Sequence, residues 1–247
     1  MKDLNLMVPP KSGLILDLDN TLVRCSEYYA DAKNGFAMLM CEKTGISQDI
    51  ALGILEALDA QSIKIDGFGR SRFPKSFQAA SVAIDTLMGK VPSKSRAKKA
   101  WSIGNSVFSA PYPLYDGAWE ALEEIKAMGF EMFICTKGDG QVQARKIRIN
   151  KLNKIFPESH IYIDSTKNET HFLRIIKEHH LFPPDVIVVG DSMKDDIGSA
   201  IKASLRSVHI SGQFEGSWSY ENEQNTPTWS IQRIGELPAL LKDVFKL

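Results

Sequence analysis

The sequence predicts an α/β protein with a doubly wound parallel sheet and an inserted helical lobe. Short apolar, β-branched segments alternate with segments of helical periodicity along most of the chain, the pattern of parallel strands joined by helical crossovers. Between the first and second predicted strands, however, about ninety residues intervene, far more than one crossover needs. With 247 residues, 43% of them hydrophobic and 24% charged, the chain can bury a full core.

Five apolar runs predict the strands. They are LILDL (14–18), FEMFICT (130–136), HIYIDS (160–165), DVIVVGD (185–191) and SVHIS (207–211). The segment 118–128 illustrates the intervening helices, because its apolar residues recur at helical spacing and Gly129 then provides a C-terminal stop. We expect an irregular loop over 211–230, followed by a last short strand and a helix that ends at Leu247.

Residues 25–110 predict the inserted lobe. Helical periodicity recurs there between breaks near Gly45, at 67–69 and at Pro92. We therefore expect a helical domain over 25–110 and a sheet domain formed by 1–24 together with 111–247.

Composition narrows the class of protein. The 30 basic residues balance the 30 acidic ones, which argues against a nucleic-acid-binding protein with a generally basic surface. The N-terminus lacks the apolar stretch of a signal peptide, and no membrane-spanning run occurs. Three scattered cysteines, Cys25, Cys41 and Cys135, suit a reducing compartment and small core positions. These features predict a cytoplasmic protein with no membrane contact.

Carboxylates gather at two strand ends. Asp17 and Asp19 close the first strand and, by its period of two, are expected to project to the same side. Asp191 follows the fourth strand, with Asp195 and Asp196 soon after. The carboxyl ends of parallel strands form the ligand crevice of α/β proteins. If Asp17 and Asp19 stood alone, a polar turn that caps a helix would explain them. Several acids that repel one another in one pocket, however, need a cation, and oxygen ligands suit Mg²⁺.

Two further groups reach the same edge. Thr136 ends the second strand and Lys167 follows the third, and both side chains can hold a phosphoryl oxygen. Either residue alone has an ordinary explanation, as a hydroxyl bonded to its own backbone or as a solvated charge. Their coincidence with the carboxylates at four strand ends favours an active site.

These motifs, DLDNTL, ICT, the lysine at 167 and GDSMKDDI, resemble those of the haloacid dehalogenase superfamily over residues 15–197. The resemblance implies a Rossmann-like core with a helical cap inserted after the first motif. Two departures leave alternatives open. Asn168 stands where the family commonly has proline, so Lys154 is an alternative to Lys167. Asp195 and Asp196 both fit the second acidic position, and Ile197 favours Asp196.

The resemblance also implies the role of each residue. Asp17 would be the nucleophile that forms an aspartyl phosphate, and Asp19 the general acid and then base. Mg²⁺ would be bound by metal-site residues Asp17, Asp19 (through its main-chain carbonyl), Asp191 and Asp196. The phosphoryl oxygens would be stabilised by Thr136, Lys167 and the backbone amides near Lys137 and Gly138.

The acid at position 19 favours a phosphatase over a dehalogenase, because a departing halide needs no proton. We therefore predict a Mg²⁺-dependent phosphatase acting on a small phosphate monoester. A phosphomutase, a phosphonate hydrolase and a non-catalytic binding protein are the alternatives. The expected partner is a small phosphorylated molecule, not a nucleic acid, and the sequence makes no prediction of oligomeric state.

Two other groups of residues lie outside these motifs. The segment DGFGRSRFP (66–74) offers a flexible backbone, apolar walls, and Arg70 and Arg72 to contact an anionic leaving group. We expect it to select the substrate. The adjacent His179 and His180 stand at a predicted helix end, where imidazoles interact favourably with the helix dipole, and they are predicted not to be zinc ligands.

Overall fold

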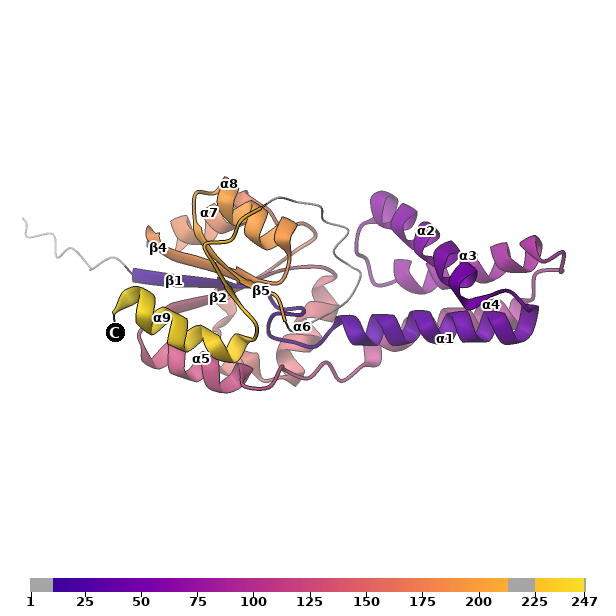
Figure 1. Ribbon diagram of the computed structural model, residues 1–247, viewed down its shortest axis with the longest axis horizontal. Helices are drawn as coiled ribbons and strands as arrows, with labels where there is room; N and C mark the ends of the chain where they lie inside the picture. The colour runs from indigo at the N-terminus through magenta and orange to yellow at the C-terminus, as the bar shows by residue number, and fades with distance from the viewer. Residues whose placement is uncertain (1–10, 213–224, 247) are drawn as a thin grey trace, which may run out of the picture. The chain divides into compact units, whose positions relative to one another are not determined.

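The computed structural model describes residues 11–212 and 225–246, which form two compact units (Figure 1). The sheet unit consists of the described residues of 1–23, 114–137 and 150–247. The helical unit consists of Arg24–Pro113 and Gly138–Ile149. The predicted N-terminal features and most of the predicted 211–230 loop lie outside the described residues.

Six parallel strands form the sheet, in the order β3-β2-β1-β4-β5-β6, which confirms the predicted α/β class. The strands are β1 Lys11–Leu16, β2 Glu131–Lys137, β3 Ile161–Asp164, β4 Leu181–Gly190, β5 Arg206–Ile210 and β6 Trp229–Ile231. The C-terminal parts of the central strands β1 and β4 are apolar and buried because helices cover both faces of the sheet.

The strand register aligns the ends that carry the acids. Leu16 pairs with Ile134 of β2 on one side and with Val189 of β4 on the other. β1 ends at Leu16, two residues before the predicted run does, but the Asp17 N–H still donates to the Val189 carbonyl at 2.9 Å. The residues that follow β1, β2 and β4 are therefore brought to one edge of the sheet.

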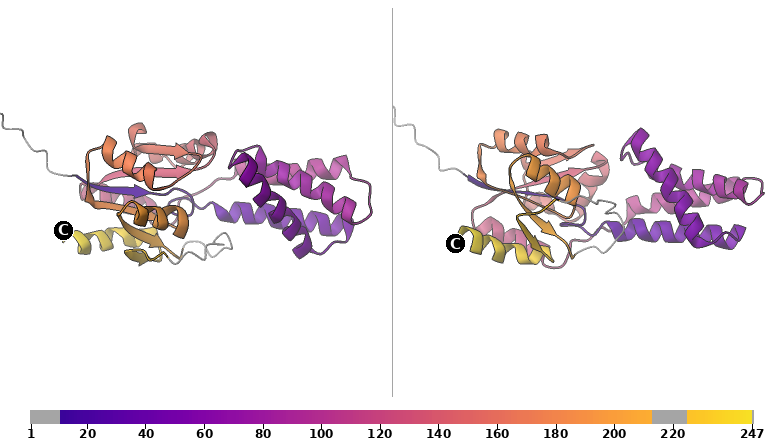
Figure 2. Two further views of the ribbon diagram at one scale, coloured as in Figure 1. Left: turned by 90° about the horizontal axis from the view of Figure 1, so that it is seen from above. Right: turned by 45° about the horizontal axis from the view of Figure 1, so that its top comes forward.

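Helices cover both faces of the sheet (Figures 1 and 2). The helices of this unit are α5 Ala118–Ala127, α7 Glu169–Glu178, α8 Ser199–Lys202 and α9 Leu237–Phe245. In Figure 1, α5 and α9 lie on one face, and α7 and α8 on the other. The predicted stop after α5 is present, since Gly129 adopts a φ of 88°, a conformation that glycine accepts without steric cost.

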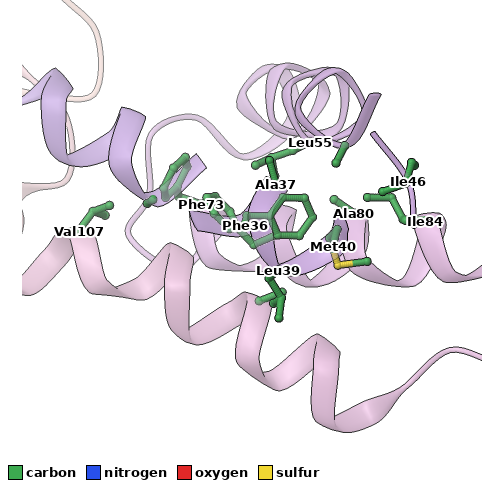
Figure 3. Packing of buried hydrophobic residues seen from close by; sticks show 14 of the residues in the cluster. Phe36, Ala37, Leu39, Met40, Ile46, Leu55, Phe73, Ala80, Ile84 and Val107 are labelled. Carbon is green, nitrogen blue, oxygen red and sulfur yellow. The ribbon is translucent and has the colours of Figure 1, made fainter. Parts of the chain in front are cut away.

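The segment over residues 25–110 is helical, as predicted. Its helices are α1 Ser26–Thr44, α2 Gln48–Asp66, α3 Arg72–Leu87 and α4 Lys94–Ser106. They enclose a core of their own around Phe36 and Phe73 (Figure 3). Phe77 belongs to the same core, with its ring centroid 5.4 Å from that of Phe36. Among the described residues, no helix has the length and apolar character needed to cross a membrane.

Helix α6 (Gly140–Ile149) belongs to the helical unit, although the predicted boundary assigned residues 111–247 to the sheet domain. Its Lys146 is 1% exposed, with Nζ 3.3 Å from the Cys25 Sγ and 4.7 Å from the centroid of the Tyr112 ring. Arg145 donates to the Ala110 carbonyl at 2.8 Å. These contacts join α6 to both ends of the 24–113 segment.

The three cysteines are free thiols. Cys25 and Cys135 are buried as predicted, whereas Cys41 is partly exposed on α1.

The predicted substrate-selecting loop is mostly helical. Helix α2 continues to Asp66 and α3 begins at Arg72, which leaves only residues 67–71 as a turn. The Arg72 guanidinium is buried, pairs with the Asp59 carboxylate, and donates to the Ser62 hydroxyl at 3.0 Å. The prediction that Arg72 contacts substrate is therefore corrected: its charge holds α2 and α3 together.

Of the other residues in the predicted 66–74 segment, Phe73 is structural and Arg70 is accessible. Phe73, 2% exposed, packs in the helical core and forms no wall of a substrate loop. Arg70 remains exposed on the turn, where its backbone N–H donates to Asp139 Oδ2 at 3.0 Å and its guanidinium lies 5.5 Å from the Phe108 ring centroid.

We expect Arg72→Met to lower the free energy of unfolding by about 3–5 kcal/mol, because it leaves the buried Asp59 carboxylate without its cation. Urea denaturation measures the effect. The exposed Arg70→Met is the matched control and should cost less than about 1 kcal/mol. Adding Asp59→Asn to Arg72→Met should recover part of the loss, and wild-type stability of Arg72→Met alone would contradict a structural ion pair.

Candidate active site

Three carboxylates converge at the carboxyl edge of the sheet. Asp17 follows β1, Asp191 follows β4, and Asp196 lies in a single π-helical segment, Met193–Gly198. One carboxylate oxygen from each lies within 4.8 Å of the others. Asp196 is 1% and Asp17 is 7% exposed, so the charges are largely removed from water.

Local hydrogen bonds fix the turn that carries Asp196. The Asp195 N–H donates to the Ser192 hydroxyl at 3.0 Å, and the Ser192 N–H donates to Asp196 Oδ2 at 3.1 Å. Gly190 completes the arrangement, since a Cβ at this position would overlap the Asp196 carboxylate. The glycine that ends β4 is therefore required for Asp196 to reach the cluster.

One buried ammonium faces these acids. Lys167 forms ion pairs with Asp17 and with Asp196, the latter at 2.5 Å from Nζ to Oδ1. The alternative residue, Lys154, is exposed in a 3₁₀ turn (Leu152–Lys154). The structure thus brings Lys167, and not Lys154, to the carboxylates.

Asn168 accounts for the departure from the family motif after Lys167. It is the N-cap of α7, and its side-chain oxygen accepts a hydrogen bond from the Thr170 N–H at 3.0 Å. Asparagine is among the best N-cap residues, so it starts the helix directly after the lysine.

The two neighbouring acids of the turn have different surroundings. Asp195 pairs with the Lys137 ammonium at the end of β2, whereas Asp196 points to Asp17 and Lys167. The π-helical turn separates them in this way, which supports Asp196 as the residue of the metal site.

The ionisation of the cluster reflects its excess of negative charge. Burial, opposed by Lys167 and reinforced by Asp196 and Asp19, raises the pKa of Asp17 to about 7. Burial and the charges of Asp17 and Asp196 raise the pKa of Asp191 well above its ordinary value. Burial alone would lower the pKa of Lys167, but Asp17 and Asp196 outweigh it and raise that pKa well above its usual range. Three acids thus share one ammonium.

These residues fit a hard divalent cation. A carboxylate set with excess negative charge and oxygen donors is the environment that Mg²⁺ prefers, and the raised pKa values of Asp17 and Asp191 indicate charge that a cation would neutralise. Asp17, Asp191 and Asp196 are the side chains placed to hold it.

Asp19 lies apart from this cluster of three carboxylates. It is partly exposed and forms a β-bridge with Val23 across a tight turn. Asn20 adopts a φ of 58° in that turn, a conformation that asparagine tolerates better than most residues, and its side-chain nitrogen donates to Asp191 Oδ2 at 3.3 Å. Asn20 was not among the predicted site residues, although its position within DLDNTL was the available signal.

The predicted phosphoryl-binding residues follow β2. Thr136 is 2% exposed and pairs with Ile163 of β3, and Lys137 ends the strand. Gly138 has a φ of 145°, which side chains rarely adopt. Its glycine identity therefore sets the direction of the chain directly after Thr136 and Lys137.

Comparisons with known proteins agree with this fold. The model of the haloacid dehalogenase-like hydrolases, a hydrolase family, matches residues 11–204. The match covers most of the chain, so this protein belongs to the haloacid dehalogenase-like hydrolases. Among curated proteins, none matches it at a significant level.

Solved structures show the same fold. A haloacid dehalogenase-like family hydrolase from Xanthomonas campestris has a TM-score of 0.76 at 21% identity, over 96% of this chain and 93% of that one. The protein described as HAD-hydrolase YfnB from Bacillus subtilis, bound to magnesium, has a TM-score of 0.61 at 17% identity, over 94% and 99%. A predicted phosphoglycolate phosphatase from Haemophilus somnus has a TM-score of 0.61 at 16% identity, over 94% and 98%. At these identities the likeness concerns the fold alone.

We expect Gly190→Ala to lower the free energy of unfolding by about 1–3 kcal/mol, because the added methyl group meets the buried Asp196 carboxylate. Denaturant unfolding measures the change. Gly235→Ala is the matched control in the same unit, since no atom lies within 4 Å of the added Cβ there, and it should change stability by less than about 0.5 kcal/mol. Equal effects of the two substitutions would show that Gly190 is not required by Asp196.

Proposed function

We propose that this protein is a Mg²⁺-dependent phosphatase that hydrolyses a small phosphate monoester through an aspartyl phosphate on Asp17. The observation that carries the proposal is that two acids close together in the sequence have different surroundings. Asp17 is buried in the cluster beside Lys167, whereas Asp19, two residues later, is partly exposed and outside it. One acid is suited to nucleophilic attack and the other to proton transfer.

In the proposed reaction the Asp17 carboxylate attacks phosphorus, and the bond from phosphorus to the leaving oxygen breaks. Asp19 gives its proton to that oxygen. As a carboxylate, Asp19 then takes a proton from the water that attacks the aspartyl phosphate, which releases inorganic phosphate and restores Asp17.

Other residues stabilise the phosphoryl oxygens or hold the cation. The Lys167 ammonium, the Thr136 hydroxyl and the backbone amides near Lys137 and Gly138 are proposed to bind the phosphoryl oxygens. The Asp17, Asp191 and Asp196 carboxylates, with the Asp19 main-chain carbonyl, are proposed to hold Mg²⁺. When bound, the cation offsets the negative charge of nucleophile and phosphoryl group.

Asp19 also supports a phosphatase over a dehalogenase within the family. An alkoxide leaving group needs a proton, whereas a halide does not, so a positioned acid benefits only phosphate ester hydrolysis. A parallel assay of an aryl phosphate and a short 2-haloacid tests the choice. Halide release without phosphate release would overturn the proposal.

We also propose how the substrate is recognised and where the protein is located in the cell, on the basis of the sequence. Arg70, exposed on its turn, is still a candidate for contact with the leaving group. A small phosphorylated molecule as substrate and a cytoplasmic location are likewise proposed.

We expect Asp17→Asn to reduce aryl phosphate hydrolysis to below about 1% of wild type, because it removes the nucleophile at nearly constant volume. The exposed Asp243→Asn is the control and should retain full activity. Circular dichroism should show that both variants are folded. Turnover of more than a few per cent by Asp17→Asn would exclude the covalent mechanism.

We also expect a chelator to stop hydrolysis and added Mg²⁺ to restore it, because the Asp17, Asp191 and Asp196 carboxylates carry more negative charge than Lys167 balances. Initial rates before and after Mg²⁺ addition measure the effect. Undiminished hydrolysis in excess chelator would rule out the metal requirement.

A further inference from the structure

A second cluster of potential ligands lies at the opposite edge of the sheet from the carboxylates. Glu131 is the first residue of β2, His160 immediately precedes β3, and His179 follows α7 just before β4. β2 and β3 are paired in parallel, and β4 belongs to the same parallel sheet. The amino ends of the three strands therefore lie on the same side of the sheet, opposite the carboxyl ends. One ligand atom from each side chain lies within 4.8 Å of the others.

Aromatic packing holds the two imidazoles. The His160 ring stacks on Phe133 with centroids 4.4 Å apart, and the His179 ring lies 4.5 Å from the same phenyl group. The imidazoles themselves meet edge to face at 4.8 Å. Phe133 is fully buried, and its ring therefore limits where both imidazoles can turn.

The hydrogen bond of His160 fixes which ring nitrogen carries a hydrogen. Its Nδ1 lies 3.0 Å from the Met132 carbonyl oxygen, and a carbonyl can only accept, so Nδ1 carries the hydrogen and Nε2 has the lone pair. A ligating histidine commonly donates its other ring N–H to a backbone carbonyl in this way.

His179 has two hydrogen-bond partners. The Tyr162 hydroxyl donates its one hydrogen to Glu178 at 2.7 Å, so the His179 Nε2–H donates to the Tyr162 oxygen at 2.9 Å. His179 also bonds with the Ser159 backbone. Coordination requires it to give up one of these bonds.

We propose that Glu131, His160 and His179 form a binding site for a transition-metal ion of the Zn²⁺ class. Two imidazole nitrogens and one carboxylate oxygen are a ligand set that zinc accepts, with water in a fourth position. Tetrahedral bonds of 2.0–2.1 Å require the ligand atoms to lie about 3.4 Å apart, so from separations of at most 4.8 Å the ligand atoms approach one another by at most about 1.4 Å.

The carboxylate of the proposed site already attracts a cation. Lys11 Nζ lies 2.5 Å from Glu131 Oε1, and its side chain is 51% exposed. It can therefore return to water when a metal ion takes its place. The bound ion would join the amino ends of β2 and β3 to the start of β4, and so stabilise the sheet at the edge away from the proposed catalytic groups.

The test is calorimetric titration of Zn²⁺ into the full chain in excess Mg²⁺, which occupies the carboxylate cluster. Wild type should bind one equivalent of Zn²⁺ and gain in Tm. His160→Asn keeps a donor for the Met132 carbonyl and His179→Gln keeps a partner for Tyr162, and each should raise the Kd at least about 10-fold. His180→Asn is the matched control, because it removes the exposed imidazole next to His179 in the sequence. His180 has a φ of 52°, which asparagine tolerates. The Kd of this variant for Zn²⁺ should equal that of wild type.

Co²⁺ provides an independent readout. Four-coordinate Co²⁺ with imidazole ligands absorbs visible light far more strongly than six-coordinate Co²⁺, so wild type and His180→Asn should show the strong bands and the other two variants should lose them. Where a histidine variant is unfolded by circular dichroism, Glu131→Gln replaces it. The proposal is overturned if wild type binds no Zn²⁺ in excess Mg²⁺, or if the folded ligand variants bind it as tightly as wild type, in which case the cluster serves aromatic packing only.

Discussion

The repulsion among three carboxylates held at one sheet edge is the constraint on which the rest of the site depends. Parallel register brings Asp17 and Asp191 side by side, and Gly190 leaves the space that Asp196 fills. Lys167 compensates only part of this charge, and removing a buried partner of this kind leaves an ion without compensation in a region of low dielectric constant. The excess negative charge of the three carboxylates over Lys167 is costly to bury, and the same excess makes the site suited to a cation. A bound cation in turn makes the site suited to a phosphoryl group.

Much of this edge could be predicted from the sequence because strand ends are local features. Asp17, Thr136 and Asp191 each directly follow an apolar run, and parallel pairing is enough to bring such positions together. The choice between Asp195 and Asp196 was less accessible, because they are adjacent in one turn. Only the π-helical geometry sends Asp195 to Lys137 and Asp196 to Lys167.

The helical unit shows where sequence reasoning fails. Glycines and arginines in residues 66–74 suggested a flexible binding loop, but Arg72 finds its partner Asp59 thirteen residues earlier across two helices. Lys146, in a helix rich in basic residues, is similarly buried against Cys25 and Tyr112. A long side chain whose charge meets a distant partner cannot be told from a solvated one by composition or periodicity, because both occur in the same sequence patterns.

The histidines extend this argument to the other edge of the sheet. His179 beside His180 at a helix end suggested interaction with the helix dipole, and no spacing motif connected it with His160, nineteen residues earlier. They meet because β2 and β3 are paired and α7 returns the chain to the amino end of β4. Parallel topology therefore collects polar groups at both edges. At the carboxyl ends, the loops directly after the strands carry acids that can be recognised in the sequence. At the amino ends, the groups come from the start of one strand and from the ends of two helical segments, and only the folded chain shows that they are neighbours.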